Sequence, residues 1–304
     1  MSHQSPWLSR RTLLAGAGAV ALAGCGDRKQ PEPAVQAAAA PQPAQDGPPE
    51  GSLEWSVAGP WRASDRVRDR WRHPVETLKF FGLDADQTVL ELWPGAGYWT
   101  EIVAPFLARN RGRYYAAQFA LGQDVDPALA QTVARFREHF GGDRTLYGDV
   151  NVTEFPPAAD KAAAPAATVD LVLMMSNLHT WMAAGMAEVA FREAFAALKP
   201  GGVLGVEQHR EPLGDVQDPA ATSGYVQEMY VKQLAAEAGF IFAASSEINA
   251  NPKDTRDHPF GVWTLPPTRL SAPRGQPENP NFDHAKYDLI GESDRMTLKF
   301  RKPA

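Results

Sequence analysis

The stretch Thr88-Val-Leu-Glu-Leu-Trp-Pro-Gly-Ala-Gly-Tyr-Trp-Thr-Glu-Ile-Val-Ala-Pro105 decides the fold of this chain. It begins with apolar residues typical of a buried parallel strand, and apolar residues then recur at helical spacing from Trp99 to Leu107. Gly95 and Gly97 lie between the two. Glycine permits positive φ angles and lets backbone N–H groups approach a ligand at the helix N-terminus. We therefore expect a strand, a glycine turn and a helix that cradle a nucleotide-type cofactor, although a plain tight connection has the same pattern.

The first residues predict export. Ser9-Arg10-Arg11-Thr12-Leu13-Leu14 has the pattern of a twin-arginine signal, and the apolar run after it is too short for an ordinary membrane span. Leu22-Ala23-Gly24-Cys25 resembles a bacterial lipobox, in which the cysteine becomes the lipidated first residue. We expect residues 1–24 to be a signal peptide and Cys25 to anchor the protein to a membrane on its periplasmic side. The alternatives are an uncleaved N-terminal anchor and a chance basic and apolar start.

Composition limits the remaining classes. Cys25 is the only cysteine, which excludes an intramolecular disulfide and a thiolate metal cluster. Residues 25–52 are rich in Pro and Ala and form a predicted tether. Residues 53–304 are long enough for one α/β domain. A net charge of −6 does not indicate a protein that binds nucleic acid.

Strand and helix patterns alternate along the domain, which predicts a doubly wound α/β fold. Helices are expected around residues 129–140, 182–198 and 225–238. The last strand has no helix before it, which points to an antiparallel partner. We expect a mostly parallel sheet of seven strands, with the first in the opening stretch and the others at residues 112–118, 145–150, 169–175, 203–207, 240–248 and 295–302.

The order of three motifs resembles the class I S-adenosylmethionine-dependent methyltransferase superfamily. These are Val89-Leu-Glu-Leu-x-Pro-Gly-x-Gly97, Val169-Asp-Leu-Val172 and Leu198-Lys-Pro-Gly-Gly202. The resemblance covers roughly residues 74–303. The Trp-Pro-Gly turn and the segment Glu247-Ile-Asn-Ala-Asn-Pro-Lys-Asp254 are similar, more narrowly, to a group of predicted exported bacterial methyltransferases.

The resemblance implies a set of cofactor-binding residues for S-adenosylmethionine. Glu91 matches the acid that organises the methionine end, and Gly95 and Gly97 match the turn. Gln118 stands where the family has an acidic side chain that accepts hydrogen bonds from the ribose hydroxyls. An amide binds hydroxyls more weakly than a carboxylate. Asp149 matches the acid near the adenine amine; a strand-end cap is its alternative.

Trp93 stands where the family usually has another glycine. Its indole is expected beside the cofactor, where it either blocks the site, simply packs, or faces the sulfonium cation with its π surface.

The acceptor side is expected beyond the carboxyl ends of the fourth and fifth strands, since ligands of open α/β sheets bind there. Asn177, His179 and Trp181 follow the fourth strand, and Glu207 and His209 end the fifth. Either histidine is a candidate general base for an acceptor that must lose a proton, and Glu207 completes the predicted catalytic set.

Each of these residues also has a structural interpretation. His179 would cap the following helix, and Glu207 would pair with Arg210. A divalent metal site of Glu207, His209 and His179 is another alternative, which we rank below the methyltransferase reading.

The segment from Asn249 to Asp294 is much longer than a hairpin needs. It is either a lid over the pocket or a surface excursion pinned by Trp263, Pro266 and Pro267. Its candidate lid residues are Asn251, Lys253, Asp254, Arg256, Asp257, His258, Phe260 and Trp263.

Three functional hypotheses follow. The first is a methyltransferase that acts on a small-molecule acceptor; Ser176-Asn-Leu-His179 lacks the Asn-Pro-Pro-aromatic motif of enzymes that methylate nucleic-acid bases. The second is an exported, lipid-anchored binding protein that keeps the fold but has lost methyl transfer. The third, a nicotinamide dehydrogenase, would need glycine at Thr100.

Overall fold

The computed structural model describes residues 47–122, 125–212, 214 and 216–304, all of which lie in one compact unit. The predicted signal peptide, Cys25 and most of the predicted tether lie outside the described residues. No helix among the described residues has both the length and the apolar character that crossing a bilayer requires.

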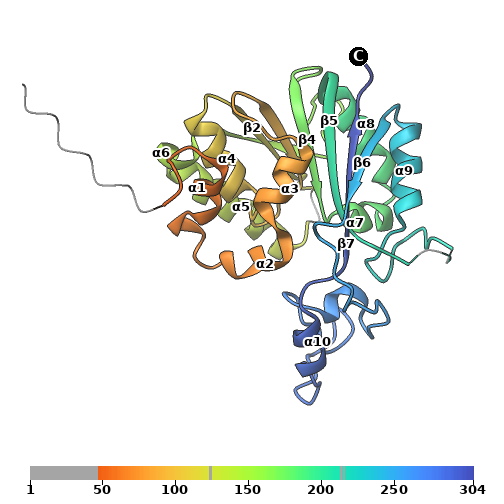
Figure 1. Ribbon diagram of the computed structural model, residues 1–304. Coiled ribbons are helices and arrows are strands. Elements are labelled where there is room, and N and C mark those ends of the chain that lie inside the picture. The colour runs from red at the N-terminus through yellow and green to blue at the C-terminus, as the bar shows by residue number, and fades with distance from the viewer. Residues whose placement is uncertain (1–46, 123–124, 213, 215) are drawn as a thin grey trace, which may run out of the picture. The chain divides into compact units, whose positions relative to one another are not determined.

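A seven-stranded sheet forms the centre of the unit (Figure 1). The strand order is β3-β2-β1-β4-β5-β7-β6, and β7 runs antiparallel to both of its neighbours. This confirms the predicted doubly wound, mostly parallel fold. The strands are β1 (Thr88–Leu92), β2 (Arg113–Phe119), β3 (Val150–Phe155), β4 (Val169–Met175), β5 (Leu198–His209), β6 (Ile241–Ser246) and β7 (Arg295–Arg301).

Helices cover both faces of the sheet, and each face has its own apolar core. One face packs against α1 (Leu53–Ala58), α3 (Pro74–Phe81), α4 (Thr100–Arg109) and α5 (Pro127–Gly142). The other packs against α7 (Leu178–Ala183), α8 (Ala187–Ala197) and α9 (Glu228–Glu237). The shorter helices are α2 (Asp69–Arg72), α6 (Arg144–Tyr147) and α10 (Ala285–Ile290), with 3₁₀ turns η1 (Pro60–Arg62), η2 (Arg66–Arg68) and η3 (Gly261–Thr264).

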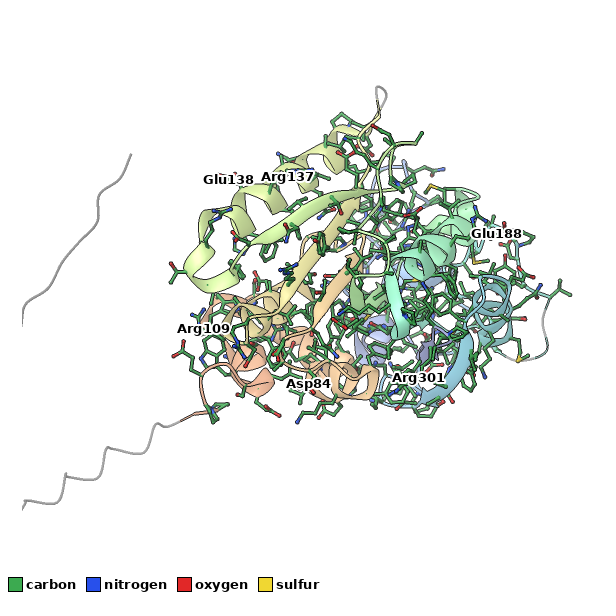
Figure 2. The ribbon with its side chains drawn as sticks, turned by 90° about the horizontal axis from the view of Figure 1, so that it is seen from above. Asp84, Arg109, Arg137, Glu138, Glu188 and Arg301 are labelled. Atoms are coloured by element: carbon green, nitrogen blue, oxygen red, sulfur yellow. The ribbon has the colours of Figure 1, made fainter. Side chains whose placement is uncertain are left out.

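Charged side chains on the outer sides of α5 and α8 point away from this layered core. Figure 2 shows Arg137 and Glu138 of α5 and Glu188 of α8 on the outer side of their helices, and all three are exposed. This is the expected polar side of amphipathic helices that bury their other side on the sheet.

The helix α4 continues through Pro105, although a proline inside a helix usually bends or ends it. Proline has no N–H group, so the carbonyl oxygen of Glu101, four residues earlier, lacks its helical donor. The indole Nε1 of Trp61 donates to that oxygen at 2.9 Å. A side chain from outside the helix therefore replaces the missing hydrogen bond.

Two predicted elements were wrong. Residues 145–150 were expected to form the third strand, but Asp143 accepts a hydrogen bond from the Leu146 backbone N–H at 3.0 Å and starts α6, and β3 begins only at Val150. The single helix expected at 182–198 is two helices, because the chain turns at Gly185 with φ +66°.

Candidate functional site

The site begins where β1 and β4 lie side by side, because this is the point at which the strand order reverses and ligands of open α/β sheets bind. Glu91 ends β1 on the face covered by α4 and is 1% exposed. Its Oε2 accepts hydrogen bonds from Thr100 Oγ1 at 3.1 Å and from Tyr114 Oη. Burial raises the pKa of Glu91 to about 7. The carboxyl group therefore binds the start of α4 to β2.

Trp93 follows β1 and has φ +54°, the left-handed region that glycine prefers. The turn thus has the backbone of the glycine expected there, with an indole attached. The indole is 9% exposed and its Nε1 donates to the carbonyl oxygen of Phe155 at 2.7 Å. Its ring centroid lies 4.4 Å from that of Phe119 and 5.7 Å from that of Trp181. The side chain therefore fills the space between the ends of β1, β2 and β3.

Gln118 and Gly97 also make contacts with other residues of the chain. Gln118 is fully buried, and its Nε2 donates to the carbonyl oxygen of Gly95 at 2.7 Å. A Cβ atom at Gly97 would lie 2.4 Å from the ring of Phe140, so this glycine is needed for contact with α5. A Cβ at Gly95 would meet nothing within 4 Å, and its φ of +60° is the reason for glycine there.

Asp149 lies away from this cluster. It immediately precedes β3, and Val150 pairs with Tyr114 at the start of β2. The side chain is 78% exposed and pairs with Arg144 at 3.0 Å. Asp149 therefore lies at the amino edge of the sheet, opposite the glycine turn, and the structure does not bring it together with the other predicted cofactor residues. The error follows from the misplaced third strand.

These contacts test whether the turn fits S-adenosylmethionine. A bulky indole fills the space at the ends of β2 and β3, and the one buried amide that would face ribose hydroxyls is bonded to Gly95. Asn177 is bound to the same turn, since its Nδ2 donates to the carbonyl oxygen of Trp93 at 2.9 Å. In this conformation the residues present do not fit the nucleoside half of the cofactor.

On the acceptor side, the tautomer of His179 is set by its neighbours. Gln208 Oε1 accepts a hydrogen bond from the Leu178 backbone N–H at 3.1 Å, and Gln208 Nε2 donates to the carbonyl oxygen of Gly224 at 3.1 Å. These two bonds fix which end of the amide faces His179 Nδ1, 3.2 Å away. Nδ1 must accept, so neutral His179 carries its proton on Nε2. Burial lowers the pKa of His179 to about 4.

His209 lies beside His179, with ring centroids 5.3 Å apart. Its Nδ1 is 2.5 Å from Ser293 Oγ. Burial, together with His179 and the cations of Arg295 and Arg72, lowers the pKa of His209 well below its usual range. Both histidines are neutral at neutral pH. Because Nε2 carries the proton, neutral His179 can donate a hydrogen bond from that atom, while its Nδ1 already accepts from Gln208; its role as a general base stays a prediction.

Glu207 does not pair with Arg210 as the structural alternative expected. Residues three apart in a strand face opposite sides of the sheet. Glu207 Oε1 lies 3.1 Å from Arg295 Nη1, and both side chains are buried. Arg210 binds Asp294 at 2.9 Å instead. Glu207 is thus part of a buried ion-pair cluster under His209, although its Oε2 has no partner among the described residues.

The metal hypothesis finds no support in this geometry. The part of the chain that the structure describes holds no group of three His, Cys, Asp or Glu side chains placed to bind a metal ion. His179 interacts with Gln208 and His209 with Ser293, while Glu207 pairs with a cation, which is a poor environment for a metal ligand.

The segment between β6 and β7 extends beyond the carboxyl edge of the sheet, at the end where α7 lies (Figure 1). Asn251, Asp254 and His258 are buried inside it. Asp254 accepts hydrogen bonds from Tyr225 Oη, from His258 Nε2 at 2.8 Å and from the Asp294 backbone N–H at 2.8 Å. The remaining candidate lid residues have other placements: Lys253 and Asp257 are exposed, and Arg256, Phe260 and Trp263 are half-buried.

Trp263 joins this segment to the acceptor side, since its ring lies 5.7 Å from that of His179. Sequence reasoning missed Gln208, Ser293 and Tyr225, which orient the histidines and Asp254. Strand alternation places Gln208 on the other face from Glu207 and His209, and this was the available signal for it.

The sequence comparisons give no family. No family model matches the chain, and no curated protein matches it. Solved structures do match. A protein from Galdieria sulphuraria assigned as a sarcosine dimethylglycine methyltransferase is similar with a TM-score of 0.50 and 17% identity, over 80% of this chain and 86% of that one.

Two further solved structures have lower TM-scores. A SAM-dependent methyltransferase from Aquifex aeolicus has a TM-score of 0.44 and 21% identity, over 62% of this chain and 90% of that one. The 1,6-didemethyltoxoflavin-N1-methyltransferase of Burkholderia thailandensis has a TM-score of 0.43 and 13% identity, over 83% and 85%. At these identities the likeness concerns the fold. The chain has the Rossmann-like fold of class I S-adenosylmethionine-dependent methyltransferases.

Proposed function

We propose that this chain is an S-adenosylmethionine-dependent methyltransferase that acts on a small-molecule acceptor. Support for the donor comes from the fold and from the turn after β1, in which Glu91 is anchored and Gly95 and Gly97 have positive φ angles. Cofactor binding then requires that Trp93 leaves the position described above, because its indole and the nucleoside cannot share that space.

One observation carries the acceptor half of the proposal. His179, His209 and Trp263 come from three separate segments and meet at the carboxyl edge of β4 and β5. Nothing in the described hydrogen bonding uses the Nε2 atom of either histidine, so both remain free for a ligand. Neutral imidazoles beside an indole suit a small, largely apolar acceptor with a few polar groups.

A second candidate function is favoured by Trp93. A protein that keeps this fold and the acceptor-side pocket, but binds its ligand without methyl transfer, has no need of an open cofactor crevice. The hydrogen bond from Trp93 to Phe155 and the bond from Gln118 to Gly95 both hold that crevice closed.

Export is a further part of the proposal. The sequence pattern of residues 1–25 supports twin-arginine export, lipidation of Cys25 and a periplasmic position on a membrane. The cytoplasm makes the methyl donor, so an exported enzyme would meet it only if the donor is carried out or supplied there. This consideration also favours the second candidate.

Isothermal titration with S-adenosylhomocysteine separates the two functions. Binding by the purified chain supports the methyltransferase. Absence of binding up to millimolar ligand, to the wild-type chain and to a variant with the indole removed, rejects it in favour of the binding protein.

A further inference from the structure

A cavity of about 330 Å³ lies at the amino edge of the sheet, opposite the candidate site. The end of α3, the residue before β1 and the start of β5 line it, together with the end of β7. A Cβ atom at Gly82 or at Gly201 would meet nothing within 4 Å. The backbone at these two wall positions therefore leaves the space open.

The strand register places two cations on the same wall of this cavity. Lys299 of β7 lies opposite Gly205 of β5, and directly paired residues of antiparallel strands point to the same face. A Cβ atom at Gly205 would lie 2.6 Å from the Phe81 ring, so this is the face that α3 covers. Arg301 is two residues further along β7 and points to the same face. Both cations therefore leave the sheet beside the end of α3.

The protein does not neutralise these two charges. No carboxylate among the described residues lies within ion-pair distance of Lys299 or Arg301. The ammonium group of Lys299 lies 4.9 Å from the centre of the Phe80 ring, and Arg301 Nη1 donates to the carbonyl oxygen of Gly201 at 3.2 Å. Burial and the neighbouring guanidinium of Arg301 lower the pKa of Lys299. Two like charges left side by side attract an anion.

Lys199 brings a third cation to the cavity. Asp170 is the one carboxylate among the described residues that line it, and both of its oxygens are bound. Its Oδ1 accepts from Lys199 Nζ at 2.7 Å, and its Oδ2 accepts from the Thr88 backbone N–H at 2.8 Å. Asp170 therefore neutralises Lys199 and leaves the two cations of β7 without a counter-charge.

A phosphate group suits this arrangement. Its oxygens point in different directions and can accept hydrogen bonds from an ammonium and a guanidinium at once, and such charge-assisted bonds are about twice as strong as neutral ones. A planar carboxylate has two oxygens, which the guanidinium fork alone would occupy. The cavity volume is near the lower end of the range for small-molecule sites, about 300–1,000 Å³. It therefore has room for a phosphate that carries a small organic group.

We propose that this cavity binds the phosphate group of a phosphate ester between Lys299 and Arg301. A small soluble ester and a phospholipid headgroup both carry this group, and the experiment distinguishes the two sources. The cavity is separate from the candidate methyltransferase site at the carboxyl edge of the sheet. The inference therefore does not depend on methyl transfer.

Calorimetric titration of the purified full chain with glycerol 3-phosphate tests the soluble source, with glycerol as the uncharged control. Arg301→Gln and Lys299→Gln should each weaken binding of the ester at least about tenfold, because each removes a charge-assisted hydrogen bond. Arg135→Gln removes an exposed arginine of α5 that has no ion-pair partner among the described residues. It changes the net charge equally and should leave the affinity unchanged.

Cosedimentation with phosphatidylglycerol vesicles tests the lipid source, with phosphatidylcholine vesicles as the control without net charge. This arm uses the Cys25→Ser chain, so that no lipid anchor contributes, and the same three substitutions made in it. Binding of either ester that both cavity variants weaken, and that Arg135→Gln does not, supports the proposal and identifies the source. No binding of either ester, a cavity variant that binds like its parent chain, or equal weakening by Arg135→Gln would each overturn it.

Discussion

The indole Nε1 of Trp93 donates a hydrogen bond of 2.7 Å to the carbonyl oxygen of Phe155, which ties the end of β1 to the end of β3. Trp93 does this from a left-handed backbone conformation that costs a residue with a side chain about 1–2 kcal/mol. The buried indole offsets that cost through its ring contacts with Phe119 and Trp181.

The first prediction concerns the stability that this side chain contributes. Replacing a buried tryptophan by a small residue costs about 3–5 kcal/mol. Glycine adopts the left-handed backbone conformation without its cost of about 1–2 kcal/mol. Trp93→Gly should therefore lower the free energy of unfolding by about 2–3 kcal/mol. Urea denaturation measures it. Trp93→Phe, which keeps a ring but not the N–H, serves as the matched control and should lie between the two. A Trp93→Gly chain as stable as the wild type would show that the indole is not a packed part of the core.

A second prediction follows from the buried carboxyl group of Glu91, whose pKa is raised from 4.5 to about 7. The folded state holds this proton more tightly than the unfolded state, so the stabilisation is full below pH 4.5 and is lost as pH rises to about 7. The difference amounts to about 3 kcal/mol. Glu91→Gln should remove it.

The measurement is the difference in unfolding free energy between wild type and Glu91→Gln at several pH values. We expect the wild-type chain to lose stability relative to the variant between pH 4.5 and 7. A difference that stays constant over this range would contradict the raised pKa.

The third prediction is that His179 stays neutral, with its proton on Nε2, down to about pH 4. Nitrogen-15 NMR of the imidazole distinguishes the tautomers and follows the titration. Gln208→Glu places a carboxylate at Nδ1 and should raise the midpoint and move the proton. A proton found on Nδ1 of the wild-type chain at neutral pH would contradict this tautomer, and a midpoint near the ordinary histidine value of about 6.5 would contradict the lowered pKa.

The fourth prediction concerns export. Changing Arg10 and Arg11 to Lys should stop transport by the twin-arginine route, and Cys25→Ser should release the protein from membranes. Cell fractionation with immunoblotting reads both outcomes. Undiminished export of the Arg10 and Arg11 variant through the same route would count against the signal assignment.

The fold could be predicted from the sequence because its signals are local. The apolar run before Gly95 marks a strand through residue types alone, whereas Lys199 to Gly202, which the pattern placed before a strand at 203–207, lies inside β5. The prediction of the third strand was wrong because it also relied on a local pattern. Thr145 to Val150 is too short for its pattern to distinguish a strand from a helix, and capping by Asp143 starts a helix there.

The site could be predicted only in part, because its contacts join distant residues. His179 and His209 were both expected at the carboxyl ends of strands, and their rings lie 5.3 Å apart; the catalytic roles of these residues and of Glu207 stay predictions. Their chemistry depends on partners that no spacing reveals: Gln208 fixes the tautomer of one histidine, and Arg295 neutralises Glu207. The position of the Trp93 indole could not be predicted either, because the indole packs against Phe119 and Phe155, which lie on other strands.

We propose that the crevice at the end of β1 is a methyl-donor site that Trp93 covers. Calorimetric titration of S-adenosylhomocysteine into the wild-type chain and into Trp93→Gly tests it most directly. We expect weak binding to the wild type and binding at least tenfold tighter to the variant, in which the indole no longer competes with the nucleoside. No binding to either protein up to millimolar ligand would contradict it.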